Sequence, residues 1–512
     1  ALYRLSYTHR TAGILYIVAL YCVLWHIALL YVYIEYLSAS YNVWRPDSGQ
    51  KYQPAAPRHN FDADLLNLSW WPDLPRKKFK FEDSTSPRKT QYHILNKQDI
   101  YKVGETLEVL ITAKDHMGRL KTYGGDLFRA KLHSPKKKAA VTGQIKDYGN
   151  GSYLTTFLLP WPGEAQVNVR LIHSIEAIAV LKNKRDKYPE KVSDTVYFKG
   201  YFESHGVSDI TECNLKVSGK DICEYKDPVT GEIWQCVRPK KLPCDSWRYH
   251  SVGGNHKVTN SFEMGFRLWV NKEEEKLPRA LIRLILTIFS ISDLTSKLPS
   301  CKMDDARACL RGRDIYMIGD STLRQWFEYL EKFIPSLKRI DLHASHVLGP
   351  LLAVDPDYGV AMRYRAHGLP LKTAKTLLSN LQYDTSQIAQ IVGGPYTVVV
   401  ITLWAHFTSY PLDVYLQRLA RVHRAVVSLL TRSPDTTVLI KSANTGYKMV
   451  YSSDWLSLQL DVLMRAAFKG MAVTILDVWD MTSCHYLPDD IHPGPPVIRN
   501  EVDLMLSYIC PK

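Results

Sequence analysis

The chain has 512 residues, of which 46% are hydrophobic and 23% charged, and it carries a formal net charge of +14. This composition is typical of a folded globular protein and excludes an intrinsically disordered chain, while the length predicts two or three domains. The positive charge suits an anionic partner, whether nucleic acid, an acidic membrane surface or an acidic glycan.

An apolar run near the N-terminus covers residues 13–36 and is interrupted only by His26 and Glu35. A run of roughly 20 apolar residues is long enough to cross a bilayer as a helix. Arg4 and Arg10 come before the run, and positive residues favour the cytoplasmic side of a membrane. The N-terminal end is therefore expected to stay in the cytoplasm, and the rest of the chain to be translocated.

We accordingly predict a short cytoplasmic end at residues 1–12 and a signal-anchor helix at residues 13–37, which would attach the chain to the membrane as a single-pass type II protein. Two alternatives remain open. The small residues Ser-Ala-Ser at 38–40 also fit a signal-peptide cleavage site, which would give a secreted chain. The apolar run could also be a buried core helix.

Cysteines and sequons favour an oxidising, lumenal compartment. Asn67 and Asn150 each begin an Asn-x-Ser glycosylation sequon. Zinc is the competing use of cysteine, but close Cys-x-x-Cys pairs are missing from the sequence, and His343 and His346 have no evident third ligand nearby, so we predict no metal. Apart from Cys22, an even set of eight cysteines fits disulfides, although 105 pairings are allowed: Cys213, Cys223, Cys236, Cys244, Cys301, Cys309, Cys484 and Cys510.

Three segments of different character follow the anchor. Residues 38–90 are rich in proline and charge, which predicts a semi-extended stem. Residues 91–200 contain short alternating runs separated by turns, which predicts an immunoglobulin-like β-sandwich that serves as a spacer or binding module. Within it, "PKKK" at 135–138 predicts an exposed loop. Residues 201–300 hold four cysteines in a short span and predict a loop-rich connector held by disulfides.

The pattern changes again in residues 301–512, where apolar strand candidates alternate with helical stretches. Such alternation predicts a three-layer α/β domain, in which helices cover both faces of a parallel sheet. Active sites in such sheets gather at the carboxyl ends of the strands. The strand candidates are 314–318, 397–403, 436–441 and 471–478, and the helical stretches lie near 322–334, 411–431, 453–469 and 495–509.

The segment "RDIYMIGDSTLRQW" at 313–326 predicts a strand, a turn and a helix. Gly319 permits the turn, and Ser321 follows at the expected N-cap of the helix. Ser321 is therefore a candidate nucleophile at the sheet edge, and capping of the helix is the alternative role.

The loop "DDIHPG" at 489–494 follows the last predicted strand and is expected at the same edge of the sheet as Ser321. A serine nucleophile needs a base, and the base needs an orienting acid. Asp489 and His492 are spaced closely enough for the carboxylate to accept from one ring nitrogen while the other ring nitrogen faces Ser321. Asp490 is the less favoured acid, because two-residue spacing points side chains apart in most extended turns. A plain surface turn is the alternative.

The block "GDSTLRQW" with a downstream D-x-x-H resembles the SGNH/GDSL-type esterase superfamily, in particular its PC-esterase branch. Together with the anchor, stem, immunoglobulin-like module and cysteine-rich connector, the chain resembles the neurexophilin and PC-esterase domain family (NXPE family) over nearly all of residues 90–512. "LWAHFTSYPLDVY" and the stretch from "IHPG" to "SYIC" are further specific parts. The resemblance implies a lumenal or secreted protein of glycan O-acyl chemistry, with a PC-esterase/SGNH-like catalytic domain at 301–512.

The motifs of the family transfer to this chain by position. Gly319, Asp320 and Ser321 match the GDS block, and Asp489 and His492 match the DxxH block. The resemblance therefore implies that Ser321 is the nucleophile, His492 the base and Asp489 the orienting acid.

General SGNH enzymes add a glycine and an asparagine to the oxyanion hole. The strand end at 402–406 is "TLWAH" and has no glycine, whereas Asn444 at the end of the next strand is a candidate donor. Arg324, one turn after Ser321, could face a developing oxyanion or an acidic substrate, or form a surface salt bridge. His406 is a candidate substrate contact, with a packed or hydrogen-bonded histidine as the alternative.

Three functions remain open on the sequence. The first is an anchored Golgi enzyme that moves an acetyl group through acyl-Ser321 onto a carbohydrate hydroxyl, with no cofactor required and acetyl-CoA considered as the acyl donor. The second is an acetylesterase with the same residues and water as the acceptor. The third is a non-catalytic secreted ligand or adhesion module. No nucleic-acid recognition motif is present, so the expected partner is an acidic glycan or glycoprotein, with sialic acid as the leading guess.

Overall fold

The structure is a computed structural model, and it describes the following residues: 61–75, 79–187, 196–219, 221–254, 280–284, 302–446, 453–485, 487 and 490–510. The predicted cytoplasmic end at 1–12, the signal-anchor helix at 13–37 and Asp489 lie outside the described residues and stay predictions. Within the described part of the chain, no helix has the length and apolar character needed to cross a membrane.

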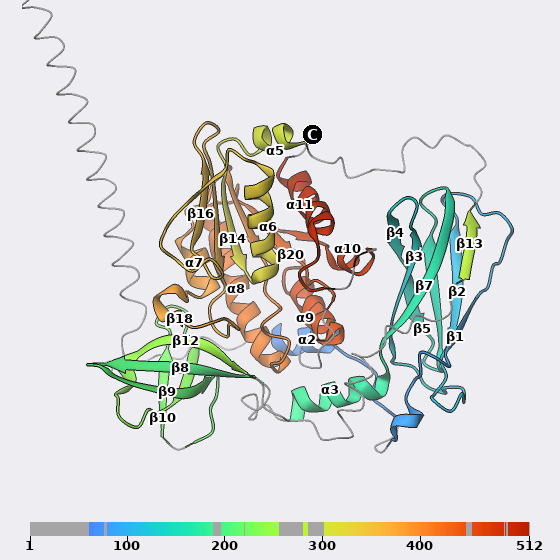
Figure 1. Cartoon of the computed structure of the whole chain (residues 1–512), viewed down its shortest axis with the longest axis horizontal. Helices are drawn as coiled ribbons and strands as arrows, with labels where there is room; N and C mark the ends of the chain where they lie inside the picture. The colour runs from blue at the N-terminus through green and yellow to red at the C-terminus, as the bar shows by residue number, and fades with distance from the viewer. Residues whose placement is uncertain are drawn as a thin grey trace, which may run out of the picture.

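Residues 91–173, together with a strand at 280–284, form two four-stranded antiparallel sheets that pack face to face (Figure 1). Alternate residues of both sheets, such as Val109 and Leu132, fill the core between them. A β-sandwich therefore lies where alternating runs predicted one, and its immunoglobulin-like character stays a prediction. The strand orders are β1 (Gln91–Ile94), β2 (Thr106–Thr112), β6 (Ser152–Leu158), β5 (Gln144–Asp147), and β13 (Ala280–Leu284), β7 (Gly163–His173), β3 (Leu127–Ser134), β4 (Ala139–Thr142).

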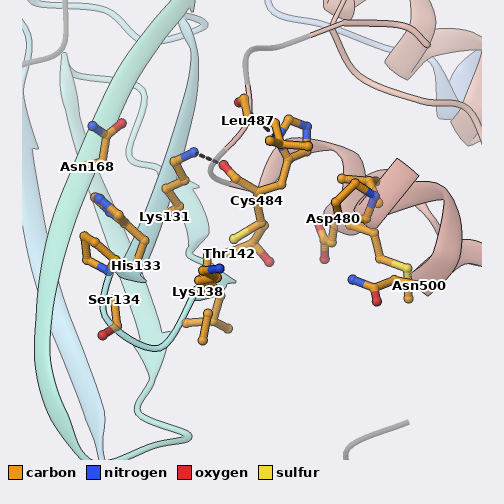
Figure 2. A pocket seen from close by; sticks show the side chains of 18 of the residues that line it. Lys131, His133, Ser134, Lys138, Thr142, Asn168, Asp480, Cys484, Leu487 and Asn500 are labelled. Carbon is orange, nitrogen blue, oxygen red and sulfur yellow. Dashed lines mark hydrogen bonds between the residues drawn. The ribbon is translucent and has the colours of Figure 1, made fainter. Parts of the chain in front are cut away.

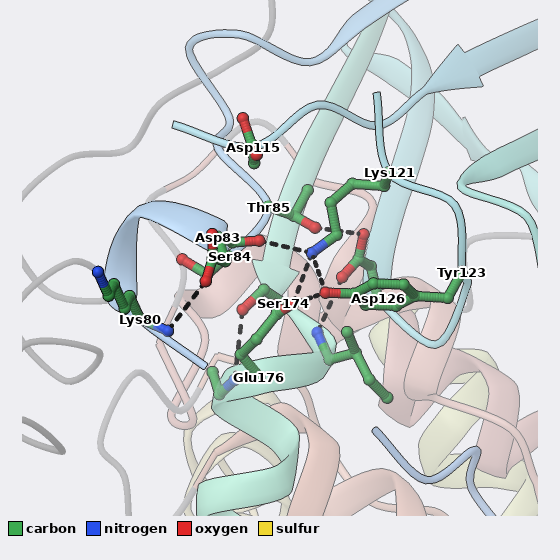
Figure 3. A network of polar contacts seen from close by, with 12 residues as sticks. Lys80, Asp83, Ser84, Thr85, Asp115, Lys121, Tyr123, Asp126, Ser174 and Glu176 are labelled. Carbon is green, nitrogen blue, oxygen red and sulfur yellow. Dashed lines mark hydrogen bonds and ion pairs between the residues drawn. The ribbon is translucent and has the colours of Figure 1, made fainter. Parts of the chain in front are cut away.

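A buried polar network fixes the start of helix α3 (Ile175–Lys187) against one end of the sandwich (Figure 3). Lys121 forms an ion pair with Glu176 and donates to the hydroxyl of Tyr123, which in turn donates to Glu176. Asp126 accepts from the backbone N–H of Ile175 at 2.8 Å, and burial raises the pKa of Asp126 to about 7. Helix α3, which continues from here toward the α/β domain, was not predicted from the sequence.

Residues 197–254 form a third sheet, so the expectation of a loop-rich connector is wrong for this stretch. Its strands are antiparallel, and two disulfides, Cys213–Cys236 and Cys223–Cys244, cross-link them. A short strand from the α/β domain, β18 (Thr376–Leu377), pairs with its edge. The strand order is β10 (Ile222–Lys226), β11 (Ile233–Val237), β9 (Val207–Asn214), β8 (Tyr197–Ser204), β12 (Trp247–Gly254), β18.

The C-terminal part contains a seven-stranded sheet in which five neighbouring strands run parallel. The four predicted strands correspond to β14, β19, β20 and β21, and the sheet is therefore parallel where the sequence predicted it. At one edge, β16 runs antiparallel to both of its neighbours, β15 and β17, and none of these three strands was predicted. The order is β15 (Lys338–Ile340), β16 (Leu351–Asp355), β17 (Val360–Ala366), β14 (Asp314–Gly319), β19 (Thr397–Ile401), β20 (Thr437–Lys441), β21 (Thr474–Leu476).

Helices cover both faces of this sheet, which makes the domain three-layered (Figure 1). The strands alternate between the two layers, because Ile315 and Met317 of β14 face one helix layer whereas Ile318 faces the other. One layer consists of α5 (Met303–Cys309), α6 (Ser321–Phe333) and α11 (Pro495–Ile509), and the other of α7 (Asp384–Gln390), α8 (Leu412–Arg432) and α9 (Asp454–Ala467). The short helix α10 (Trp479–Ser483) follows β21.

Part of the predicted stem packs onto this domain, so the semi-extended stem is wrong for residues 61–75. Helix α2 (Phe61–Leu68) contributes Leu65 to the core beside α8 and α9. Trp71 then meets Trp455 edge to face, with ring centroids 6.2 Å apart. The sequon residues Asn67 and Asn150 are both exposed, as a glycosylation acceptor must be.

A disulfide between Cys309 and Cys510 joins α5 to the end of α11 across a sequence separation of 201 residues. It ties the beginning of the α/β domain to its end. Cys484 is not disulfide-bonded within the described residues, and Cys301 lies outside them. Six of the eight cysteines expected in disulfides are therefore paired here.

A buried arginine joins the third sheet to the α/β domain. Arg418 of α8 is 1% exposed. Its Nε is 2.6 Å from Glu232, in the turn before β11, and its Nη1 is 3.2 Å from Asp384 of α7. It also donates to the carbonyl oxygens of His367 and Leu369. One side chain thus satisfies two buried carboxylates from separate parts of the chain.

We expect Arg418→Ala to lower the free energy of unfolding by roughly 3–5 kcal/mol, because it leaves Glu232 and Asp384 buried without their cation. Arg421→Ala is the matched control, since Arg421 lies on the same helix and pairs with the same Glu232 at 3.0 Å but is more exposed. Arg421→Ala should lower the free energy of unfolding by about 1 kcal/mol or less. Urea unfolding followed by circular dichroism measures both, and equal losses would contradict this account.

Candidate active site

Three neighbouring strands of the parallel sheet are held together at their carboxyl ends. β14 ends at Gly319, where an added Cβ would lie 2.5 Å from the carbonyl oxygen of Thr402. Only glycine allows so close an approach to the segment after β19. Thr402 in turn donates its hydroxyl to the carbonyl oxygen of Lys441, at the end of β20, at 3.2 Å. This closure places the residues that follow the three strands around one point.

The cap of helix α6 is Asp320, and Ser321 is the first residue of the helix, so the prediction that Ser321 is the N-cap is wrong. Asp320 Oδ1 accepts from the backbone N–H of Thr322 at 2.9 Å and from its hydroxyl at 2.7 Å. Asp320 Oδ2 accepts from the backbone N–H of Ala405 at 3.2 Å. Asp320 therefore caps the helix, and the alternative role that was considered for Ser321, capping in place of catalysis, is already filled.

Ser321 and His492 form a hydrogen bond between two elements that are far apart in sequence. Ser321 Oγ lies 2.7 Å from Nε2 of His492. Ser321 stands in the first turn of α6 at the end of β14, and His492 lies in the loop before α11. This distance is within the reach that proton transfer between a nucleophile and its base requires.

Two amide side chains hold the loop on either side of His492. Asn444 Nδ2 donates to the carbonyl oxygen of Ile491 at 2.9 Å. Gln325 Nε2 of α6 donates to the carbonyl oxygen of Pro493 at 3.4 Å. Asn444 is fully buried and therefore positions the loop of the base. Gln325 was not predicted, since its partner lies 168 residues away in the sequence.

Two acidic residues, Asp489 and Asp490, precede His492 closely in the sequence, and the structure describes Asp490. Asp490 Oδ1 accepts from the backbone N–H of His492 at 2.9 Å, so this carboxylate shapes the turn. Asp489, the acid that the sequence favours, lies outside the described residues. Burial lowers the pKa of His492, while the charges of Asp320 and Asp490 oppose this effect. His492 is consequently neutral, and able to accept a proton, at neutral pH.

A buried lysine connects the serine segment to the histidine loop. Lys441 Nζ donates to Asn444 Oδ1 at 2.6 Å and lies 3.3 Å from the hydroxyl of Thr322, the residue after Ser321. It is fully buried, and burial lowers its pKa while the nearby charge of Glu501 opposes the shift. The sequence offered one signal for it, a lysine at the end of an otherwise apolar strand, "TTVLIK".

His406 is a hydrogen-bonded histidine close to the pair. Its Nδ1 accepts from the backbone N–H of Lys372 at 2.9 Å, so its Nε2 carries the proton. Its ring meets that of His367 edge to face, with centroids 5.1 Å apart. Burial lowers the pKa of His406 to about 4. It is therefore a neutral hydrogen-bond donor.

Arg324 lies one turn beyond Ser321 and pairs with Glu328 of the same helix, with Nε 3.5 Å from Oε1. Its side chain is 17% exposed, so the pair is more enclosed than a surface salt bridge. The charge of Arg324 also contributes to lowering the pKa of His492.

His343 and His346, the two histidines weighed as metal ligands, have exposed side chains that approach Asp341 and Glu328. Across the described residues, no group of three metal-binding side chains forms.

Two family models match this chain. Residues 66–261 match a model described as neurexophilin, and residues 293–510 match a model described as NXPE family member 4-like, C-terminal domain. The chain is therefore similar to neurexophilin in its N-terminal part and to the NXPE family in its C-terminal part. The second match includes both Ser321 and His492, so the hydrogen-bonded pair lies in the part that is similar to the NXPE C-terminal domain.

Two solved structures show a distant similarity to this chain. A family two carbohydrate esterase from Clostridium thermocellum, in complex with cellohexaose, is 10% identical with a TM-score of 0.22 over 62% of this chain and 86% of that chain. An active site mutant of a family two carbohydrate esterase from the same organism is also 10% identical, with a TM-score of 0.22 over 62% and 85%. A TM-score this low does not establish a shared fold.

A serine that is activated by its histidine should react with a fluorophosphonate probe even before its substrate is known. We expect the probe to label the chain at Ser321, and Ser321→Ala to abolish the labelling. His492→Ala should slow it by roughly 10²–10⁴-fold, which is the usual contribution of a general base. Mass spectrometry of the labelled peptide identifies the site. Labelling elsewhere, or undiminished labelling of Ser321→Ala, would contradict the assignment.

The pH dependence of this labelling tests the environment of His492. Only the neutral imidazole accepts the serine proton, so the rate should rise with pH as His492 loses its proton. Because burial lowers the pKa of His492 from its usual value of 6.5, half of the maximal rate should be reached below pH 6.5. Labelling rates between pH 4 and pH 8 measure the midpoint. A midpoint clearly above 6.5 would contradict the burial argument.

Proposed function

We propose that this protein is a serine-dependent carbohydrate O-acyltransferase of the lumen, which moves an acetyl group onto a sugar hydroxyl through acyl-Ser321. The observation that carries the proposal is the 2.7 Å hydrogen bond between Ser321 Oγ and His492 Nε2 at the carboxyl edge of the parallel sheet. The match of residues 293–510 to the NXPE C-terminal domain and the resemblance of their motifs to PC-esterases support the choice of glycan O-acyl chemistry.

The reaction uses Ser321 and His492 twice. In the first half, Ser321 Oγ attacks the acyl carbonyl carbon and His492 Nε2 takes the hydroxyl proton. The tetrahedral intermediate then collapses to acyl-Ser321, and His492 returns the proton to the leaving group. In the second half, His492 takes a proton from the sugar hydroxyl, which attacks the acyl carbonyl carbon. The second tetrahedral intermediate then collapses, and His492 returns this proton to Ser321 Oγ as the leaving group. Asp489 is the proposed acid that orients the imidazole.

The oxyanion of each tetrahedral intermediate needs hydrogen-bond donors. The backbone N–H of Ser321 is the first donor of helix α6, and no acceptor among the described residues pairs with it. The positive end of the helix dipole adds to its effect. His406 supplies a neutral Nε2–H nearby. Asn444, which the sequence favoured for this role, already donates to Ile491, so its proposed part is to hold the base in place.

Hydrolysis of acetyl esters is the second candidate function, and one observation favours it. His492 is partly enclosed, which lowers its pKa, but part of it stays exposed to solvent, so water can reach the Ser–His pair in place of a sugar hydroxyl. Transfer requires that the bound acceptor excludes this water. The proposed donor for transfer is acetyl-CoA, and no cofactor is required for either reaction. The proposed acceptor is an acidic glycan or glycoprotein, sialic acid first among them, and the proposed location is the Golgi lumen.

Ser321→Ala should abolish acyl transfer while the free energy of unfolding stays nearly unchanged, because Asp320 rather than Ser321 caps α6. Asp320→Ala should cost about 1 kcal/mol or more, since it removes the cap. His492→Ala should be nearly as damaging to activity as Ser321→Ala, and Asp489→Asn less so. Thermal unfolding and transfer of radiolabelled acetyl groups measure the two properties. A folded Ser321→Ala chain that keeps its activity would refute the serine mechanism.

The same assay separates the two candidate functions. The chain is incubated with radiolabelled acetyl-CoA, with and without a sialylated acceptor, and the labelled products are compared with the free acetate released. Label that appears on the acceptor supports transfer. Release of acetate alone, at a rate that the acceptor does not change, supports the esterase. Absence of both activities in a chain that the phosphonate probe labels would point to another acyl donor.

A further inference from the structure

A cavity of about 840 Å³ lies between the β-sandwich and the α/β domain (Figure 2). One wall is the outward face of β3, β4 and β7. The other consists of α10, the first turns of α11, and the residues Cys484, His485 and Leu487. We call it the interdomain cavity. Its volume is in the range of sites that hold small molecules or several sugar units.

The cavity wall that belongs to the sandwich is basic, because side chains along β3 point alternately into the core and into the cavity. Phe128, Ala130 and Leu132 point into the sandwich core, so Lys131 and His133, which alternate with them along the strand, face outward into the cavity. Among the described lining residues, three are cations, Lys131, Lys138 and Arg170, and one is an acid, Asp480. Burial raises the pKa of Asp480.

Contacts across the cavity hold the two walls at a fixed spacing. Lys131 Nζ donates to the carbonyl oxygen of His485 at 2.7 Å (Figure 2). Beside the cavity, Arg129 pairs with Asp454 of α9 at 2.6 Å. Lys138 ends the turn between β3 and β4, and no acidic side chain of the described residues pairs with it. The "PKKK" turn therefore brings one cation to the cavity that no interdomain contact uses.

The cavity adjoins the loop that carries His492. Leu487 and Pro496, which lie before and after His492, both line it. Pro496 is four residues from His492, so their Cα atoms are at most about 14 Å apart. A ligand of several sugar units can therefore occupy the cavity and still reach the Ser–His pair.

We propose that the interdomain cavity binds the acidic part of an oligosaccharide substrate, through its carboxylate or sulfate group. This inference rests on the proposed function, since it assigns a remote subsite to the same reaction. The cations supply the charge that such a group needs, and hydroxyl and amide side chains suit the sugar hydroxyls. No Phe, Tyr or Trp is among the described lining residues, which disfavours a nucleotide that would stack its base. The polar lining includes Ser134, Thr142, Asn168 and Asn500.

Binding of defined oligosaccharides to the full chain tests the proposal. Isothermal titration should detect 3′-sialyllactose and 3′-sulfated lactose, whereas lactose, which lacks the acidic group, should bind at least tenfold more weakly. Added salt should weaken the binding of the two acidic ligands, because it screens the interaction between partly exposed charges. Equal binding of lactose would overturn the proposal. So would binding of coenzyme A in the cavity with no binding of either acidic lactose.

A pair of double variants tests the location. Lys138→Gln with Arg170→Gln removes two cations from the cavity and should weaken 3′-sialyllactose binding at least tenfold, as loss of charge-assisted contacts does. Lys136→Gln with Lys137→Gln removes the same amount of charge from the turn that carries Lys138, but these residues do not line the cavity, so the change should be under twofold. Equal weakening by both variants would show a general charge effect and overturn the assignment.

Two further readouts keep the tests decisive. If the first double variant unfolds, the single changes Lys138→Gln and Lys137→Gln, both on an exposed turn, make the same comparison. Phosphonate labelling of Ser321 in the unaltered chain reports on the proposed function alone. A chain that is labelled but does not bind the acidic lactoses contradicts only the cavity, whereas a chain that binds them without being labelled contradicts the serine mechanism.

Discussion

Lys441 is the buried charge around which the candidate site is arranged. A lysine placed among apolar strands is unfavourable unless polar groups surround it, and the groups that do so here are Thr322, Asn444 and the carbonyl oxygen of Ser442. Thr322 adjoins the serine and Asn444 holds the loop of the histidine. The need to satisfy one ammonium group thus draws together two segments that would otherwise be independent.

The elements that could be predicted from the sequence are those with a strong, regular pattern of apolar residues. β14, β19 and β20 are apolar on both faces because helices cover both, and helices such as α8 show a regular apolar stripe. The strands that were missed have weaker signals. β17 alternates Arg363 and Arg365 with buried residues, β18 has only two residues, and the strands of 197–254 were obscured by the cysteines and turns between them.

The residues of the candidate site also fall into those that could be predicted from the sequence and those that could not. Ser321 and His492 were found because motifs and strand ends placed them, and the structure brings them together. Asp320 and Ser321 are both good helix caps, so sequence could not decide which of them caps α6. The role of Asn444 depended on a partner 47 residues away, and that of Gln325 on one 168 residues away. Such pairings arise from tertiary packing, which no local pattern records.

The pairing of β18 with β12 has a consequence for the order of events during synthesis. Residues 197–254 leave the ribosome well before residues 376–377, which complete their sheet. Their core also waits for Leu378, Tyr383 and Tyr410 from the later segment. Since nascent domains generally fold from the N-terminus as units, this sheet is an exception: its edge strand stays open, and its tryptophans partly uncovered, until more than a hundred further residues have been translated. Chaperones that bind exposed apolar segments would meet the chain in that interval.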